Sequence, residues 1–369
     1  MTKHDQAAAA ERTKRALAEQ DGIRPHDRQV DVESLGLSPT RSLDLAECQS
    51  FSELLTGMRD TSFGGRQLGE AADVLEEMVR DEDCLVIGTF SGAMTVAKQG
   101  LLLCDMIDHG MLDVVVSTGA LMTHGLIEAT GLRHFKVPTD MTDRQLYYAG
   151  LDRVYDTLEL EENLDDLESW VREILRGWPD GKTACSRTIC AALGEHLEAH
   201  APGRGILKSA LRRGVPVYIP AFTDSELGLD FALHNRRRRR EGRPTIPFDP
   251  FLDLEDYTER VSKAERLGIF TVGGGVPRNW AQQVSPYIDL IRSRAEGDSP
   301  GQRFRYGVRL CPEPVHWGGL SGCTYSEGVS WGKFVPPADG GRFAEVAVDA
   351  TIAWPLLLAG VLERLGAGT

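Results

Sequence analysis

Three side chains near the end of the chain combine a carboxylate, an aromatic ring and an amine in one short stretch. They are Glu327, Trp331 and Lys333, and glycines lie between them. Glu327 can pair with an ammonium group, Trp331 can hold one against its ring face, and Lys333 can form a carbon–nitrogen double bond with a carbonyl carbon. The pattern indicates a pocket for a cationic substrate that becomes bound to a lysine. A glycine-rich loop with a surface lysine and a packed tryptophan is the alternative, and for an isolated motif it is the commoner one.

The composition describes an acidic, folded protein. The 369 residues carry a formal net charge of −14, and 41% of them are hydrophobic. The charge argues against general affinity for nucleic acid and favours cationic partners such as polyamines. No apolar run reaches the roughly 18 residues of a membrane helix and no signal segment is evident, so we expect a cytoplasmic protein without membrane contact. The seven cysteines show no paired spacing, so we expect neither a disulfide framework nor a bound metal.

Short apolar runs of strand length alternate with helical stretches along most of the chain. Because these runs are largely apolar, they are typical of a parallel sheet that is buried on both faces. We therefore predict an α/β protein with a doubly wound, mainly parallel sheet and helices on both faces. The expected strands are 84–88, 113–117, 216–220, 268–272, 305–310 and 344–348. The expected helices are 42–55, 68–79, 94–109, 121–129, 164–176, 186–199, 206–213, 254–267, 279–294 and 351–365.

Some segments fall outside this alternation. We expect residues 1–30 to form a mobile arm with some helix, and residues 31–369 to form a single domain. Gly64 and Gly65 are expected to break the chain between two helices, and residues 133–162 to be an insertion. Residues 235–250, with Arg236 to Arg240 and three prolines, are expected to be a surface loop. The arginine run could bind phosphate or nucleic acid, but such runs more often lie solvated on a surface.

Small and polar residues follow the predicted strands at their carboxyl ends, where ligands bind to an open parallel sheet. Glycines there let the backbone approach a pyrophosphate, and the N-termini of the following helices would stabilise its charge. Asp224 or Asp349 could accept hydrogen bonds from a ribose. No G-x-G-x-x-G fingerprint is present, and each turn alone could be a simple strand-to-helix connection. The turns are 88–93, 117–120, 223–226, 273–275 and 349–351.

Taken together, several motifs resemble the deoxyhypusine synthase family. The matching stretches are 111–119, 216–224, 273–276, 327–333, 349–350 and 355–358. The run Glu-Gly-Val-Ser-Trp-Gly-Lys at 327–333 is highly specific to that family. The resemblance extends over about residues 43–365, which is nearly the whole chain apart from the N-terminal arm.

The resemblance implies a Rossmann-like NAD-binding fold and a homotetramer whose active sites lie at subunit interfaces. It implies that spermidine is oxidised with NAD, that its aminobutyl group forms an imine on Lys333, and that an amine acceptor then takes this group. By the same likeness, NAD would contact Gly92, Ala93, Thr118, Gly119, Ala120, Asp224, Asp349 and Ala350. The polyamine pocket would include Gly274, Gly318, Gly319, Glu327 and Trp331.

The sequence departs from the main branch of the family at several site positions. Gly92 and Ala93 replace a serine–asparagine pair, His124 replaces a glutamate, and Asn279 replaces a histidine. The stretch 317–322 replaces a more acidic loop. These differences resemble a bacterial deoxyhypusine-synthase-like branch, and they favour a small amine over a protein as the acceptor.

His124 and Asn279 could have chemical roles at these positions. His124 could carry a proton or contact the polyamine, because an unperturbed histidine titrates near pH ~6.5. Its alternative is a histidine near a helix start that hydrogen bonds satisfy. Asn279 could orient an amine or the nicotinamide amide, and its alternative is a helix N-cap.

We therefore expect NAD-dependent aminobutyl transfer from a spermidine-like donor to a small polyamine, with a product of the homospermidine type. Three alternatives stay open: deoxyhypusine synthesis on a protein lysine, a specialised amine or guanidine transfer, and a non-catalytic protein that binds NAD or polyamine. The presence of Lys333 weighs against the last alternative.

Overall fold

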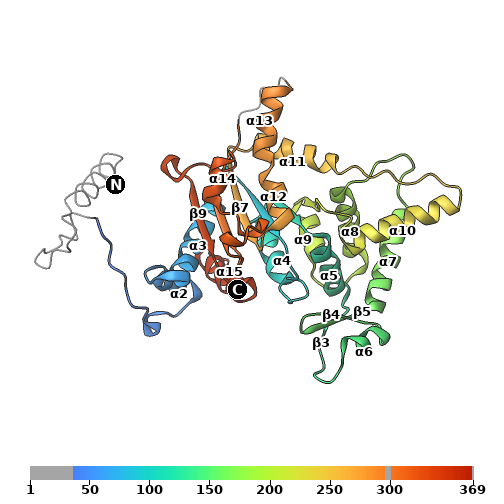
Figure 1. Cartoon of the computed structure of the whole chain (residues 1–369), viewed down its shortest axis with the longest axis horizontal. Helices are drawn as coiled ribbons and strands as arrows, with labels where there is room; N and C mark the ends of the chain where they lie inside the picture. Colours follow the sequence, from blue (N-terminus) through green and yellow to red (C-terminus); the bar gives the residue numbers. More distant parts are fainter. Residues whose placement is uncertain (1–35, 296–300, 368–369) are drawn as a thin grey trace, which may run out of the picture.

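The computed structural model describes residues 36–295 and 301–367, and Figure 1 follows the chain from blue to red. The arm expected over residues 1–30 lies outside the described residues. The described part contains one sheet of six strands and one of three strands. Within these ranges, no helix combines the length and the apolar character that crossing a bilayer requires.

The six-stranded sheet is parallel throughout, which confirms the predicted α/β class. Its strand order is β6-β2-β1-β7-β8-β9, so the chain builds one half outward from β1 and then returns to build the other half from β7. Each predicted apolar run forms one of these strands. The run 216–220 keeps only two strand residues, because a proline, which has no N–H to donate, stands at each end. The strands are β1 Cys84–Phe90, β2 Val114–Ser117, β6 Val217–Tyr218, β7 Arg266–Val272, β8 Phe304–Leu310 and β9 Arg342–Val346.

Helices cover both faces of this sheet, and alternate strand residues face different helices. In β1, Val86 and Phe90 belong to an apolar cluster that includes residues of α3, α4, α5 and α15. Ile87 belongs to a second cluster with residues of α11, α12 and α13. Burial on both faces explains why the strands are apolar at successive positions. The helices are α2 Phe51–Arg59, α3 Phe63–Arg80, α4 Gly100–Asp108, α5 Gly119–Thr130, α7 Glu161–Arg176, α8 Ser186–His200, α9 Ile206–Arg213, α10 Glu226–Arg240, α11 Phe251–Lys263, α12 Gly275–Gln282, α13 Val284–Arg294, α14 Tyr325–Ser330 and α15 Ala350–Arg364.

The predicted break in the chain at Gly64 and Gly65 was wrong. Gly64 and Gly65 do not break the chain, but lie in the first turn of α3, which buries Leu68, Leu75 and Met78. Packing of this apolar face outweighs the roughly 1 kcal/mol that each glycine costs in a helix. The predicted helix 279–294 also differs, because it begins earlier and is divided into α12 and α13.

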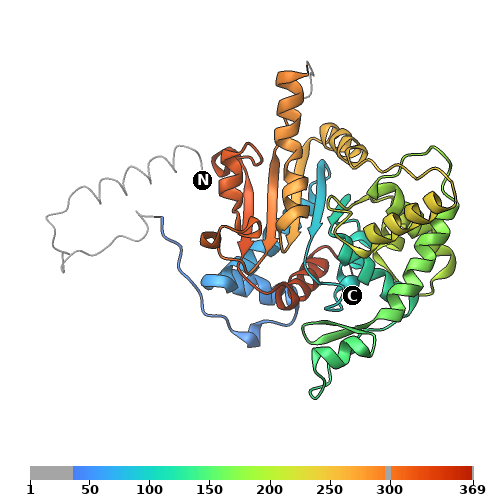
Figure 2. The same cartoon turned by 45° about the vertical axis from the view of Figure 1, so that its right-hand side comes forward.

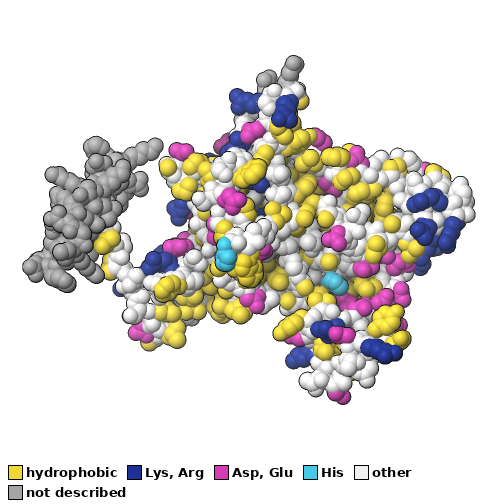
Figure 3. Space-filling model, in the orientation of Figure 1, with side chains coloured by type: hydrophobic (Ala, Val, Ile, Leu, Met, Phe, Trp, Pro, Cys, Tyr) yellow, Lys and Arg dark blue, Asp and Glu magenta, His cyan; other side chains and the backbone are white. Residues whose placement is uncertain are grey.

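The arginine run forms the end of α10, so the loop prediction was wrong for Arg236–Arg240. Arg238 is buried and donates to the carbonyl oxygen of Pro244 at 2.6 Å and to Asp180 at 2.9 Å. Cationic side chains are favourable in a last helical turn, because the carbonyl groups there carry partial negative charge. Figure 3 shows Lys and Arg side chains gathered at this end of the molecule. Arg238 therefore connects the end of α10 to the segment that follows it.

The expected insertion at 133–162 forms the three-stranded antiparallel sheet. Its strands are β3 Phe135–Lys136, β5 Thr157–Leu160 and β4 Leu151–Val154, in that order across the sheet, with α6 Asp143–Tyr148 between β3 and β4. In Figure 2, as in Figure 1, this small sheet lies beside the helices α5 and α7. Leu158 and Glu159 of β5 are both buried, so this strand contributes one apolar and one polar side chain to the interior.

Trp354 offers a test of the core on the face covered by α15. Its side chain is buried against Phe90 of β1 and Phe270 of β7, with ring centroids 5.5 and 6.4 Å away. Trp354→Ala should lower the free energy of unfolding by about 3–5 kcal/mol, because the cavity left behind cannot close completely. Ile352→Ala, at a side chain of α15 that is 64% exposed, should change it by less than about 0.5 kcal/mol. Urea unfolding of both variants makes the comparison, and equal losses would contradict this account of the core.

Candidate active site

The turns predicted to bind ligand lie along one edge of the six-stranded sheet. Parallel strands end on the same side, so residues that follow each strand share this carboxyl edge. The strands β1 and β7 are neighbours although they are far apart in sequence, and the turns after them lie at the middle of the edge. The predicted residues on this edge are Gly92 and Ala93 after β1, Thr118, Gly119 and Ala120 after β2, Asp224 after β6, Gly274 after β7, and Asp349 and Ala350 after β9.

Gly274 brings three of the loops at this edge into contact. Its N–H donates to Ser91 Oγ after β1 at 2.9 Å. A Cβ atom at position 274 would lie only 2.7 Å from the Cα atom of Ser321, in the loop before α14. Its neighbours Gly273 and Gly275 have φ angles of 78° and 62°, which favour glycine. The triple glycine therefore sets the spacing between the loops after β1, β7 and β8.

Lys333 follows the short helix α14, and the backbone on both of its sides is held in place. Gly332 turns the chain with a φ of 66°. The N–H of Lys333 donates to the carbonyl oxygen of Gly328 at 3.0 Å, and its own carbonyl accepts from the N–H of Phe304 at 2.9 Å. Phe304 is the first residue of β8, so the amino-terminal end of this strand positions the backbone of the lysine.

The side chain of Lys333 meets a residue of α12. The lysine is 9% exposed, and its Nζ atom lies 3.1 Å from Oδ1 of Asn279. Asn279 is inside α12, whose N-cap is Gly274, so the alternative of an asparagine N-cap was wrong. The hydrogen bond leaves the amide nitrogen of Asn279 as a donor on the other side of the same group.

Two buried arginines hold the loop that leads to α14. Arg278 donates to the carbonyl oxygens of Leu320 at 2.9 Å and Cys323 at 2.8 Å. Arg309 donates to those of Ser321 at 2.7 Å and Cys323 at 2.6 Å. Both guanidinium groups are almost fully buried and hold the loop, and Arg278 adds positive charge beside the lysine. Neither arginine was predicted as a site residue, and the only signal in the sequence was Arg309, a charged residue within the apolar run of β8.

The surroundings of Lys333 lower the pKa of its amine below the ordinary value of 10.5. Burial is the largest cause, because it removes water from the charged form, and the positive charge of Arg278 acts in the same direction. The nearby groups of Cys323 and Glu327 oppose this shift. A lower pKa increases the neutral fraction of the amine, and only the neutral amine can attack a carbon atom.

The other predicted substrate residues near Lys333 are exposed. Trp331 is 66% exposed, and Glu327 and Gly318 also lie at the surface. Gly319 packs so closely against Glu313 that a side chain at this position would overlap its carboxylate. The motif 327–333 thus has a buried amine at one end and a solvent-facing carboxylate and indole beside it.

His124 lies in a different cluster, with His134 and Glu159. His124 Nδ1 and His134 Nε2 each lie 2.8 Å from the same oxygen of Glu159, Oε2. Burial raises the pKa of Glu159, but hydrogen bonds from His124, His134 and Asn163 outweigh it and bring the pKa to about 2. His134 and Glu159 are in the insertion, where no pattern in the sequence pointed to them.

Within one chain, Lys333 and His124 belong to different sides of the sheet. Phe334, next to the lysine, is in the apolar cluster with α12, whereas Leu121 and Leu126 of α5 are in the opposite cluster. His124 lines a cavity between α5, α7, α10 and the small sheet, and the residues that line this cavity do not include Lys333. Within one chain, Lys333 therefore contacts Asn279, whereas His124 lies in a separate cavity.

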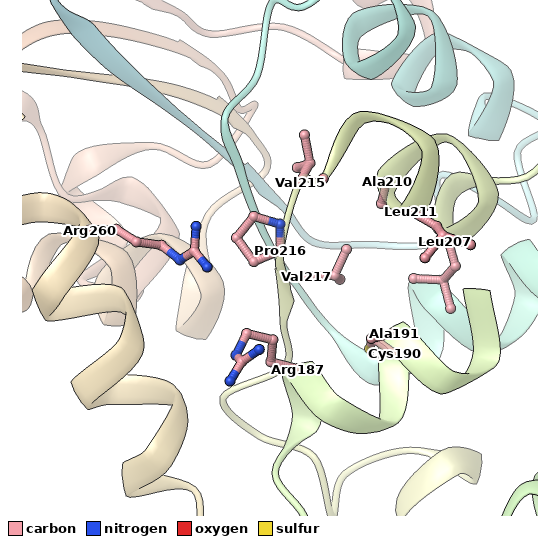
Figure 4. Close-up of a pocket in the computed structure, with 11 residues that line it drawn as sticks. Arg187, Cys190, Ala191, Leu207, Ala210, Leu211, Val215, Pro216, Val217 and Arg260 are labelled. Atoms are coloured by element: carbon pink, nitrogen blue, oxygen red, sulfur yellow. The ribbon is translucent and has the colours of Figure 1, made fainter. Parts of the chain in front are cut away.

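A further cavity lies at the opposite, amino-terminal end of β6 (Figure 4). It is lined mainly by aliphatic side chains from α8, α9 and residues 215–217. Its two cations, Arg187 and Arg260, both pair with Asp256, at 3.3 and 2.9 Å. The paired charges and the distance from the carboxyl edge set this cavity apart from the candidate site.

Comparison with known proteins identifies the family of this α/β protein. The family model described as deoxyhypusine synthase matches residues 53–361. The chain therefore belongs to the deoxyhypusine synthase family, as the motifs in its sequence indicated.

Relatives cover most of the chain. The probable deoxyhypusine synthase 2 of Methanosarcina acetivorans is 33% identical over 329 residues, which are 89% of this chain and 90% of the relative. The deoxyhypusine synthase-like protein of Chlorobaculum tepidum is 30% identical over 302 residues, 81% of this chain and 83% of the relative. A crystal structure assigned as a deoxyhypusine synthase from Entamoeba histolytica has a TM-score of 0.56 at 13% sequence identity, covering 87% of this chain and 96% of its own. This last likeness concerns the fold alone.

The lowered pKa of Lys333 predicts an unusual pH dependence of acylation. Because the folded protein disfavours the charged amine, Lys333 should become reactive at a lower pH than an exposed lysine such as Lys263. Pulse labelling with acetic anhydride across pH 7–11, followed by mass spectrometry, measures the midpoint for each lysine, independent of how fully each one reacts.

Arg278→Met should move the midpoint of Lys333 to higher pH, since one of the two causes of the shift is removed. The midpoint of Lys263 serves as the control and should stay constant. A midpoint for Lys333 at or above that of Lys263 in the unmodified protein would contradict the electrostatic account.

Proposed function

We propose that this protein is an NAD-dependent aminobutyltransferase that carries the group as an imine on Lys333. The observation that carries the proposal is the buried amine of Lys333, held against Asn279 with a lowered pKa. Membership of the deoxyhypusine synthase family supports spermidine as the donor. A small polyamine is the acceptor that we favour, and the product is then of the homospermidine type.

The carboxyl edge of the sheet fits a dinucleotide. If the six strands are numbered along the chain, their order is 3-2-1-4-5-6, the order of the doubly wound Rossmann fold. Thr118 caps α5, and Asp349 caps α15, so the N–H groups of two helix starts face this edge. The glycines at 273–275 leave no side chains in the turn beside them. We assign NAD to this edge, with Gly92, Ala93, Thr118, Gly119, Ala120, Asp224, Asp349 and Ala350 as its contacts.

The chain supplies the groups that would handle the transferred fragment. When bound at this edge, NAD would supply the redox chemistry, as acceptor of a hydride from the carbon of the four-carbon arm next to the secondary amine of spermidine and as donor of one to the product imine. Lys333 attacks that carbon, 1,3-diaminopropane leaves, and the four-carbon fragment stays on Nζ as an imine. The acceptor amine then replaces Lys333 at the same carbon, and the lysine becomes free again. Spermidine and putrescine are thereby converted to homospermidine and 1,3-diaminopropane, with no net oxidation.

The exposed part of the lysine motif would hold the cationic ends of the donor. Glu327 pairs with a terminal ammonium, and Trp331 presents its ring face to it, a contact worth about 0.5–2 kcal/mol. We assign Gly274, Gly318 and Gly319 to the chain of the polyamine, and Gly318 has open space beside it. Asn279 keeps the amine of Lys333 aimed, since its Oδ1 accepts from Nζ at 3.1 Å.

The placement of His124 supports an active site shared between subunits. The family resemblance assigns His124 to the substrate side, yet in one chain it lies on the other face of the sheet from Lys333. A second copy of the chain could bring its own α5 to the Lys333 motif. We therefore propose a homotetramer with active sites at its interfaces.

Deoxyhypusine synthesis on a protein lysine is the second candidate function. It is favoured by the names of the relatives, which include the probable deoxyhypusine synthases of Methanosarcina. The two functions share every step up to the imine on Lys333, and they differ only in the amine that removes the fragment.

Incubation of the purified protein with NAD, spermidine and putrescine should produce homospermidine and 1,3-diaminopropane in equal amounts. Chromatography of the derivatised amines measures both products. Borohydride added during turnover should fix a four-carbon fragment on Lys333, and Lys333→Ala should abolish transfer while NAD binding persists. If 1,3-diaminopropane forms without homospermidine, another acceptor is used; if neither forms and no adduct is found, the proposed chemistry is wrong.

Mixed oligomers test the shared active site. Lys333→Ala and His124→Gln should each lose most activity alone, and co-expression with two different affinity tags allows purification of the mixed oligomer. If one subunit supplies the lysine and its neighbour the histidine, some sites in the mixture contain both native residues and activity returns in part. Mixed oligomers as inactive as the single variants would place both residues of a site in one chain.

A further inference from the structure

An acidic cavity lies where α5, α7, α10 and the small sheet meet. In Figure 3, Asp and Glu side chains gather above the small sheet with a histidine beside them. The cavity has a volume of about 480 Å³, and His124 and Glu159 line it from α5 and β5. Its other carboxylates come from β4, α7 and α10: Asp152, Glu161, Asp165, Glu168, Glu226 and Asp230. Acidic side chains alone do not define a site, but His124 adds a group that can accept a proton here.

A chain of close polar contacts leads from the surface to this cavity. The ammonium of Lys98 lies 3.1 Å from Glu128 and 2.6 Å from Nδ1 of His134. Nε2 of His134 lies 2.8 Å from Oε2 of Glu159, although not in ideal hydrogen-bond alignment. Nδ1 of His124 lies 2.8 Å from the same oxygen. The backbone φ angle of Lys98 is 63°, a value that residues other than glycine rarely adopt. The surrounding structure must therefore hold this conformation.

These contacts determine where the imidazole protons lie. The ammonium of Lys98 can only donate, so Nδ1 of His134 accepts and its proton lies on Nε2, facing Glu159. Glu159 is ionised and can only accept, so His124 must carry a proton on Nδ1. Asn163 donates to the second oxygen of Glu159 at 3.0 Å and thus holds the carboxylate in this orientation. In neutral His124, Nε2 is therefore left as an acceptor.

The three side chains could also be considered as metal ligands. Their ligand atoms lie within 4.8 Å of one another. A metal-bound histidine normally donates its second ring N–H to an acceptor, however, and the second nitrogen of His134 faces the ammonium of Lys98. The positive charge beside His134 therefore favours a proton relay over a bound cation.

We propose that Glu159, oriented by His134 and Asn163, is a positioning residue that holds His124 with its proton on Nδ1, so that Nε2 accepts a proton from a polyamine ammonium in the acidic cavity. The step breaks one N–H bond of the ammonium; the proton moves to Nε2, the electron pair stays on the amine nitrogen, and His124 becomes an imidazolium. The amine is then neutral and nucleophilic. This inference rests on the proposed function, because it supplies the deprotonation that an acceptor amine needs before it can attack the imine.

The charges around the cavity agree with a cationic ligand. The pKa of Asp230 is raised to about 7, first by burial and then by the negative charges of Glu168 and Glu226. Glu161 also has a raised pKa, caused first by its hydrogen bond with Asp152 and then by the charge of that residue. A polyamine would relieve this mutual repulsion of carboxylates. The imidazolium formed at His124 would in turn be stabilised by Glu159.

Nitrogen NMR of the full-length protein, labelled at histidine, can test the tautomer without any turnover. The signals of His124 are assigned by their loss in His124→Gln. We expect the neutral ring to be protonated at Nδ1, the Nε2 signal to shift when spermidine is added, and Glu159→Gln to redistribute the proton between the nitrogens. A neutral ring protonated at Nε2, or no response to spermidine, would overturn the proposal even if aminobutyl transfer is observed.

Kinetics separate positioning from general stability. Glu159→Gln should lower kcat roughly tenfold or more, with little change of KM for the donor, and should alter the pH profile of kcat. Glu162→Gln, at an exposed neighbour of the same charge, is the matched control and should leave both unchanged. Glu159→Asp should restore part of kcat.

Stoichiometric zinc binding that disappears in Glu159→Gln would instead identify a metal site and overturn the proposal. If Glu159→Gln does not fold, the tautomer and spermidine response of the unmodified protein decide. Absence of product from the unmodified protein, with the tautomer as expected, would count against the proposed function alone.

Discussion

The proposed chemistry depends on keeping one amine neutral inside a protein. Lys333 is removed from water, its Nζ atom contacts an amide oxygen and not a carboxylate, and the nearby Arg278 disfavours a second positive charge. A carboxylate in the place of Asn279 would stabilise the ammonium and remove the nucleophile. Backbone carbonyls pair with the terminal nitrogens of both arginines, and Glu345 also pairs with Arg309, which offsets part of the cost of burying these groups beside a lysine.

This arrangement is built from segments that are distant in sequence. Asn279 follows β7, the loop held by the arginines follows β8, and Lys333 pairs through its backbone with the start of β8. β7 and β8 are parallel neighbours in the sheet, so the segments that follow them lie close together. Each element therefore contributes one group, and the lysine is positioned by backbone hydrogen bonds more than by its own side chain.

Much of the fold could be predicted, because strands that are buried on both faces are apolar at successive positions of the sequence. The six strands of the main sheet and most helices were found in this way. Predictions from local sequence were wrong where tertiary contacts decide the conformation. Gly64 and Gly65 lie inside α3, and Arg238 lies in the last turn of α10, where it pairs with Asp180. Lys333, Glu327 and Asn279 were found as candidates through their motifs, and the contact between Lys333 and Asn279 appeared only in three dimensions. Glu159 and His134 could not be predicted as site residues, because their contacts with His124 depend on the approach of a short strand to α5.

The close approach at Gly274 has an evolutionary consequence. The distance between the loop after β7 and the loop before α14 is set by a missing methyl group, since a Cβ at position 274 would lie 2.7 Å from the backbone of Ser321. The exposed side chains of Trp317 and Leu320 in the same loop can be exchanged without altering that spacing. Substrate preference can thus diverge through the outer side chains of this loop while the geometry around the reactive amine is inherited unchanged.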